Sequence, residues 1–486
     1  MPGGALKPPH HDPPTQWKIF RAIALKELRD HARGRRFLLG AGMTLALCLL
    51  ATTIRVKDFR QAHQERNLFL QRWVPSVTEQ LERDEVVQVE NTRAMSPLSL
   101  LAVGLEPVVP FRFTSTKEGL RFGQSRGAQN TVDALFGYLD ITFIVTTLLS
   151  LLSIALTFDS ICGERANGTL ALLLSYPVER RTFVAGKIAG NLFVAVLSFL
   201  PALMVTYSIA LLSGIGSLSL AHWVNYAAFG CLYIAIFVTI GVAVSARARV
   251  PVDAQLASLV IWVLLVFALP RVVALGVNQL HPPTRAVELA IREDEELSRL
   301  RLEHNRRLER AFRLYLSADS GAASRRDDFD RARRDSLDEL RRERRLKIGR
   351  IWEEQRAAEE ARESYSRILS ALSPAALFQH AAAELAWTGV EQRRHFVNEA
   401  RHYDEKIGRP LSESRDILYA RDSDARGRAL VVHDDVRSLM VPFQPTWAPS
   451  SAILRSTVIP LLLLSLFELS AVMIAIRTME RLDARP

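Results

Sequence analysis

Six apolar blocks constrain this chain more than any other feature of its sequence. Each block holds roughly 18 to 25 residues, enough for an α-helix to cross a hydrocarbon layer about 30 Å thick. Stretches dense in Arg and Glu separate the blocks, so the 49% hydrophobic and 23% charged residues of the 486-residue chain are segregated. We therefore predict an all-α membrane protein with about six transmembrane helices. The predicted spans are Phe37–Ile54, Leu139–Phe158, Ile188–Leu212, Trp223–Ser245, Ala254–Gly276 and Ser456–Ile476.

Basic residues in the short flanks of these spans predict a single orientation. Lys and Arg accumulate on the cytoplasmic side of short loops, whereas long loops cross largely regardless of charge. All four basic flanks fall on one side if both termini are cytoplasmic, and the connection 213–222 carries no Lys, Arg, Asp or Glu. We predict a multi-pass protein of the cell inner (cytoplasmic) membrane. The flanking residues are Lys18, Arg21, Lys26, Arg29, Arg33, Arg35 and Arg36; Arg165, Arg180, Arg181 and Lys187; Arg247 and Arg249; and Arg477, Arg481 and Arg485.

The two ends of the chain have simple interpretations. Residues 1–16 are rich in proline and predict a disordered tail, without the features of a cleavable signal. Residues 17–36 predict an amphipathic helix at the cytoplasmic interface, and residues 477–486 a short cytoplasmic tail.

Two long segments are then predicted outside the cytoplasm, at 55–138 and 277–455. The first combines a polar helical start with a Pro- and Gly-punctuated stretch and predicts no definite fold. The second predicts helices over 284–316 and 324–372, with an apolar seam that favours a helical hairpin. Ser373-Pro374 predicts the start of a third helix that continues towards Tyr403. Acidic residues interleave with the basic runs of the hairpin, so a solvated helix face is favoured and nucleic-acid binding is not expected.

The most informative stretch, residues 159–187, lies between the second and third spans; we call it the coupling segment. Gly168-Thr169 can begin a brief amphipathic helix that Pro177 ends, on the basic side of the membrane. A soluble partner that binds such a helix could move the second and third spans. Any one of its polar pairs, such as Glu164-Arg165, could also belong to an ordinary loop, but the ordered run in this position favours the functional interpretation.

This stretch resembles permeases of the ABC-2 type transporter superfamily, through the run Asp159, Glu164-Arg165 and Gly168-Thr169-Leu170, then Ser175-x-Pro177-Val178, Arg181 and Gly186-Lys187. In that family the loop is a coupling helix that docks on an ATP-binding subunit, and residues 17–36 look like the family's elbow helix. The resemblance implies an ATPase-coupling site. Its expected residues are Asp159, Glu164, Arg165, Gly168, Thr169, Leu170, Ser175, Pro177, Arg181 and Lys187.

The insert between the fifth and sixth spans narrows this resemblance. It is similar to that of permeases with a helical domain, related to those linked with multicopper enzyme maturation, and Ser373-Pro374 and Thr388-Gly389 fit that subgroup. The resemblance implies two permease subunits, identical or paralogous, above two ABC ATPase subunits.

The chain is not expected to be an enzyme. Gly186-Lys187 is followed by Ile188 and preceded by Arg181 where a P-loop needs Gly, so ATP and Mg are expected to bind to a partner subunit. We find no protease, hydrolase or Cys/His metal pattern, and the three cysteines are interpreted as small buried hydrophobes.

Two charged residues lie well inside predicted spans, and Asp140, at the outer edge of the second span, is interpreted as marking the interface. Glu468 is placed near the middle of the sixth span, and Arg271 lies in the fifth, nearer the outer face. Charged residues in membranes face a cavity or a partner, so Glu468 and Arg271 are candidates for the substrate path or for helix pairing. A structural role for Glu468, protonated or between subunits, is the alternative.

Two functions remain open at this stage. The first is a permease subunit that couples ATP hydrolysis to substrate movement. The second is a mechanical or scaffolding subunit that relays ATPase motion to an exported protein without transporting a substrate.

Overall fold

The computed structural model of the protein describes residues 16–32, 34–82, 88–116, 119–123, 125, 138–176, 178–215, 219–280, 282, 286–317, 322–408, 410 and 440–481. Within these residues, six helices are long and apolar enough to cross a membrane, which confirms the predicted number. The spans are α2 (Arg35–Glu82); α4 (Ile141–Phe143), η3 (Ile144–Leu149) and α5 (Ser150–Thr157); α8 (Arg180–Leu212); α9 (Leu220–Arg247); α10 (Pro251–Val263), η4 (Leu264–Ala268) and α11 (Leu269–Leu280); and α18 (Ser450–Glu480).

The bundle is organised around α9. Helices α5, α8, α10 and α18 all pack against it. The second and fifth spans each contain a π-helical stretch, η3 and η4, whose altered register frees backbone groups for other contacts. Hydrogen bonds join the two spans and α9 here: Trp262 Nε1 donates to Ser150 Oγ at 2.8 Å, and the Tyr233 hydroxyl donates to the Thr146 carbonyl at 2.9 Å.

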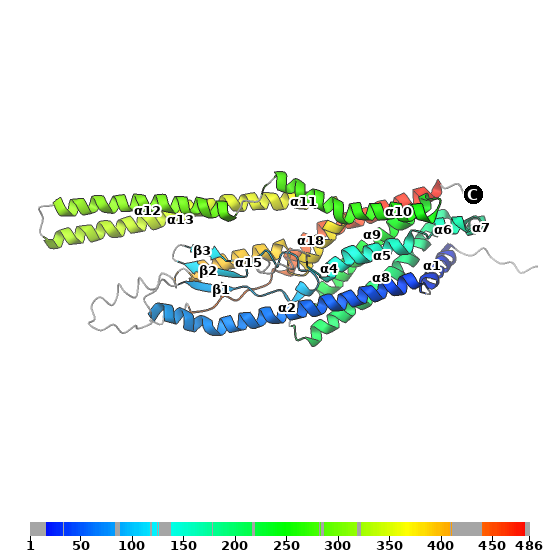
Figure 1. The fold of residues 1–486 in the computed structure, drawn as a ribbon, viewed down its shortest axis with the longest axis horizontal. Coiled ribbons are helices and arrows are strands. Elements are labelled where there is room, and N and C mark those ends of the chain that lie inside the picture. Colours follow the sequence, from blue (N-terminus) through cyan, green and yellow to red (C-terminus); the bar gives the residue numbers. More distant parts are fainter. Residues whose placement is uncertain are drawn as a thin grey trace, which may run out of the picture.

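The first span does not end at the membrane surface. Helix α2 continues without a break to Glu82, 28 residues beyond the predicted end at Ile54, which adds about 42 Å at 1.5 Å per residue. The expected loop therefore begins as a rigid extension of the span (Figure 1).

A small core on the predicted outer side forms against this extension. Strands β1 (Val89–Thr92), β2 (Arg112–Thr116) and β3 (Gly119–Phe122) make an antiparallel sheet in that order, a minor addition to the predicted all-α fold. Phe113 of β2 lies at its centre and makes edge-on contacts with Phe396, Tyr403 and Phe443, with ring centroids 5.0 to 6.1 Å apart. Trp73 of α2 is buried in the same cluster, so the extension of α2 supports the sheet.

The predicted hairpin is confirmed. Helices α12 (Ala286–Ser317) and α13 (Ala322–Ser370) pack side by side and project far from the bundle (Figure 1). Contacts between the helices include Phe329 with Phe312, and Arg307 with both Glu339 and Glu343.

The expected third helix is in fact two helices. Helix α14 (Pro374–Leu385) begins as predicted, with Ser373 as its N-cap. The helix is interrupted at residues 386–389, and α15 (Val390–Tyr403) and η5 (Asp404–Gly408) follow. Trp387 adopts a φ of 54° at the break, where the Thr388 hydroxyl donates to the carbonyls of Ala102 and Ala383. Helix α14 lies within the bundle against α9, α18 and η4, so the segment 277–455 includes one helix packed among the spans.

Candidate coupling site

The coupling segment folds into two short helices at one end of the bundle. Helix α6 (Cys162–Ala166) is followed by Gly168, whose φ of 73° turns the chain into α7 (Thr169–Ser175). Glycine adopts this left-handed conformation without steric cost. The Thr169 hydroxyl donates to the Glu164 carbonyl at 3.1 Å and links the two helices. The short helix predicted to begin at Gly168-Thr169 is therefore present; Pro177 lies outside the described residues.

Helix α7 has one buried face and one exposed face. Leu170 is buried with Phe183 and Val184 of α8. Leu172 and Tyr176 are each 64% exposed. An exposed Leu and Tyr beside an anchored helix are suited to contact with another protein, because aromatic residues often carry binding energy at interfaces. The Ser175 hydroxyl only closes the helix, by donating to the Leu172 carbonyl.

Lys187 is the centre of a buried charge cluster beneath α6. Its side chain is 2% exposed, and its Nζ donates at 2.7 Å to an oxygen of Glu27, at 2.7 Å to Glu164 Oε1 and at 2.8 Å to the Ser160 carbonyl. Lys26 Nζ also donates to Glu164 Oε1 at 2.7 Å. We call Lys26, Glu27, Glu164 and Lys187 the Lys187 cluster. Its two cations and two anions balance, which offsets the cost of burying charge.

The cluster ties the coupling segment to helix α1 (Gln16–Ala32), the helix predicted at the cytoplasmic interface. Burial lowers the pKa of Lys26, but the hydrogen bond and charge of Glu164 outweigh it and leave the pKa above its ordinary value. The amide of Asn191 donates to Glu27 Oε2 at 3.3 Å and adds a further contact from α8.

Two glycines of α8 allow α1 to come close. A Cβ at Gly190 would lie 2.7 Å from the Glu27 Cβ and 2.9 Å from the Ala24 carbonyl oxygen, and one at Gly186 would lie 3.0 Å from Ile23. Small residues spaced by four allow this kind of close helix packing in membrane proteins. Glu27 can reach Lys187 because these positions lack side chains.

Three further charged residues of the segment bind other helices. Arg165 donates to the carbonyls of Ala246 and Ala248 at 3.1 and 2.7 Å, where the last carbonyls of α9 lack helical partners. Asp159 accepts from Arg36 of α2 at 2.8 Å, and Arg181 pairs with Glu480 of α18 at 2.9 Å. The coupling segment thus contacts α1, α2, α8, α9 and α18.

The two ionisable residues inside the spans do not pair with each other. Glu468 accepts a hydrogen bond from the Thr239 hydroxyl of α9 at 2.8 Å, which makes it a contact between two spans. Arg271 is exposed on α11, and among the described residues no ion pair joins it to Glu468.

Sequence reasoning missed Lys26, Glu27 and Ser245 as members of the site. Ser245 of α9 accepts from the backbone N–H groups of Ile161 and Cys162 at 2.9 and 3.1 Å. The available signal for Glu27 is that it is one of only two acidic residues, with Asp30, on the mainly basic helix α1.

A model of a known protein family covers most of the chain. The model described as ABC-2 family transporter protein matches residues 21–468. The chain belongs to this family. A member of the ABC-2 family is a membrane permease subunit and not itself the ATPase, as the sequence predicted.

Two curated relatives match shorter segments. The probable ABC transporter permease protein NosY of Pseudomonas aeruginosa is 41% identical over 51 residues, which are 10% of this chain and 18% of the relative. The protein of the same name from Stutzerimonas stutzeri is 39% identical over 57 residues, 12% of this chain and 21% of the relative. The chain therefore matches only about a fifth of each relative's length. Both matches fit the subgroup that the sequence indicated.

Proposed function

We propose that the α6–α7 segment of this ABC-2 permease subunit is the docking site of a separate ATPase subunit, and that it transmits the work of ATP hydrolysis to the spans. The exposed Leu172 and Tyr176 on the anchored helix α7 carry the proposal. ATP and Mg bind to the partner, and the membrane is the cell inner membrane with both termini in the cytoplasm.

Force applied to α7 has a defined route into the bundle. The Lys187 cluster connects α6 to α1 and α8, and Arg165 connects it to the end of α9. Buried ion pairs hold a fixed geometry, because separating either partner leaves an uncompensated charge. In this proposal α5, α6, α8 and α1 move together when the ATPase closes on ATP, and a second permease subunit completes the substrate path.

The test is co-purification of the ATPase with variants of the exposed face of α7. Leu172→Asp and Tyr176→Asp are expected to reduce recovery of the ATPase about thirtyfold or more, the effect of losing an interface residue worth about 2 kcal/mol. Val108→Asp, at a residue 66% exposed on the predicted outer side, is the matched control and should not change recovery. Undiminished recovery with both α7 variants would refute the docking site.

A mechanical relay is the second candidate, and the position of α14 favours it. Helix α13 leads through Ser373 into α14, which packs on α9 and α18, and α13 also packs on α11. Movement of the spans would thus be passed to the hairpin, which could act on an exported partner. Spin labels at Leu302 of the hairpin and Val108 of the exported core, in the complete complex, should report an ATP-dependent distance change. An unchanged distance together with vectorial substrate movement would favour transport alone.

A further inference from the structure

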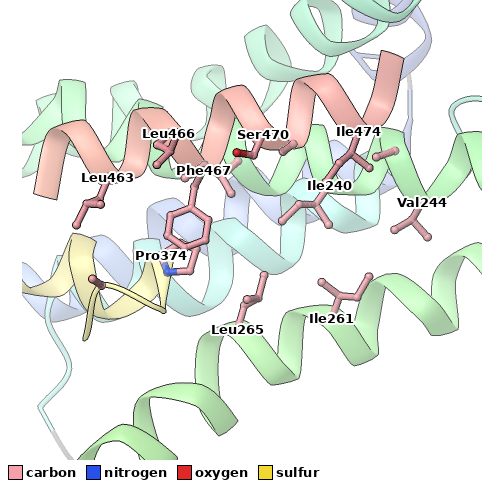
Figure 2. Close-up of a pocket in the computed structure, with 14 residues that line it drawn as sticks. Ile240, Val244, Ile261, Leu265, Pro374, Leu463, Leu466, Phe467, Ser470 and Ile474 are labelled. Carbon is pink, nitrogen blue, oxygen red and sulfur yellow. The ribbon is translucent and has the colours of Figure 1, made fainter. Parts of the chain in front are cut away.

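A cavity of about 540 Å³ lies between α9, α10 and α18 (Figure 2). Leu463, Phe467 and Ile474 of α18 face Ile261 and Leu265 across it. Among the described residues that line it, Ser470 alone carries a polar side chain. A polar ligand would lose hydrogen bonds to water here without replacing them, so the occupant must be apolar.

The cavity extends along α18. Its lining on α18 runs from Leu463 to Ile474, eleven positions apart, which corresponds to about 16 Å along a helix. This is close to half of the roughly 30 Å hydrocarbon core. One end is bounded by Ala371 and Pro374 at the base of the hairpin, where the Ser373 hydroxyl donates to the Leu265 carbonyl at 2.9 Å. The cavity therefore has the length of one leaflet.

Two arginines lie just beyond its other end. Arg247 follows the lining residue Val244 by three positions on α9, and Arg477 follows Ile474 by three positions on α18. Residues three apart lie on the same side of a helix. Both arginines are exposed, and neither forms an ion pair within the described part of the chain. They supply two positive charges at the level of lipid head groups.

We propose that this cavity binds one acyl chain of an anionic phospholipid, from the leaflet on the side of the coupling segment. The acyl chain would fill the cavity up to Pro374, and the phosphate of the lipid would lie between Arg247 and Arg477. A small apolar solute would fill the cavity but would not interact with Arg247 or Arg477, whereas an anionic phospholipid would use both features. This proposal does not depend on docking of an ATPase.

The test uses the full chain in phosphatidylcholine vesicles that contain phosphatidylglycerol with a photoactivatable diazirine in one acyl chain. Mass spectrometry should locate the label on Leu463–Ile474 and on Ile261 or Leu265. Ala243→Phe, which fills the cavity from α9, should reduce this labelling about tenfold, equivalent to about 1.4 kcal/mol. Ala257→Phe, on an exposed position of α10, is the matched control and should leave the labelling unchanged.

Further variants keep the test decisive. Leu466→Ala enlarges the cavity and should retain labelling, which guards against misfolding as the cause of a loss. Arg247→Gln and Arg477→Gln should each weaken labelling about fivefold, as expected for about 1 kcal/mol per basic residue, whereas Arg249→Gln should not. Labelling spread evenly over exposed positions, equal labelling by a diazirine phosphatidylcholine, or labelling only by a diazirine alkane would overturn the proposal.

Discussion

At the end of the bundle that carries the coupling segment, α1, α6 and α8 are joined by ion pairs. At the other end, α14 is held among α9 and α18 by rings and small side chains, as in the stacking of Phe378 on Tyr233 with centroids 5.0 Å apart. Loss of one charge from a buried pair leaves its partner uncompensated and is strongly destabilising. The destabilisation caused by losing an apolar contact instead scales with the size of the group that is removed. Under the proposed function, force enters the bundle through directional contacts, whereas the hairpin is attached to it through apolar packing.

The largest effect is expected from Lys187→Met. Glu27 and Glu164 would lose their central cation in a buried site, which costs about 3 to 5 kcal/mol of unfolding free energy. Thermal and denaturant unfolding in detergent would measure it, with Lys18→Met, on an exposed position of α1, as the control. Adding Glu27→Gln to Lys187→Met should recover part of the loss. Equal stability of the two Lys variants would mean that the cluster does not hold this end together.

Gly190→Leu should have the next largest effect. The new side chain would collide with Glu27 and Ala24 and push α1 from α8, at a cost of about 1 to 3 kcal/mol. The control is Gly42→Leu in α2, where an added Cβ meets no atom within 4 Å. Faster hydrogen exchange in α1 is expected with Gly190→Leu only. Protection of α1 that is the same in both variants would contradict the close packing of α1 on α8.

Ser373→Ala should have a smaller effect at the opposite end of the bundle. It removes the N-cap of α14 and the bond to the Leu265 carbonyl, together worth about 0.5 to 2 kcal/mol. Hydrogen exchange should rise in α14 while α1 and α6 stay protected. Ser370→Ala is the control, because its hydroxyl bonds only within α13, to Ser366. Increased exchange in α6 would show that the two ends are not held independently.

The smallest effect is expected from Arg181→Gln. Its ion pair with Glu480 is exposed, with Arg181 73% exposed, and such pairs contribute about 0.2 to 1 kcal/mol. The difference from the unaltered chain should vanish in 1 M salt, where the Debye length is about 3 Å. A loss as large as that of Lys187→Met would remove the distinction between buried and exposed pairs drawn above.

Local signals predicted much of this fold. The spans follow from apolar blocks of sufficient length, the hairpin from its apolar seam, and the start of α7 from Gly168-Thr169. Each of these patterns lies within one short stretch of sequence and depends on helix geometry alone.

The features that the sequence did not predict depend on tertiary contacts. Glu27 and Lys187 are 160 positions apart, and no spacing rule connects them. The twelve residues of α14 are too few to be recognised as a membrane element, and its place among the spans depends on partners such as Tyr233. The extension of α2 beyond Ile54 is stabilised by packing of Trp73 against the sheet, which hydropathy does not report.

The most direct test of the proposed function is to determine on which side of the membrane α7 lies. A single cysteine at Leu172, in a chain whose three native cysteines are replaced, would be probed with a membrane-impermeant thiol reagent in sealed right-side-out vesicles. The account predicts no labelling until the vesicles are opened, while a cysteine at Leu302 of the hairpin is labelled at once. Immediate labelling at Leu172 would contradict it.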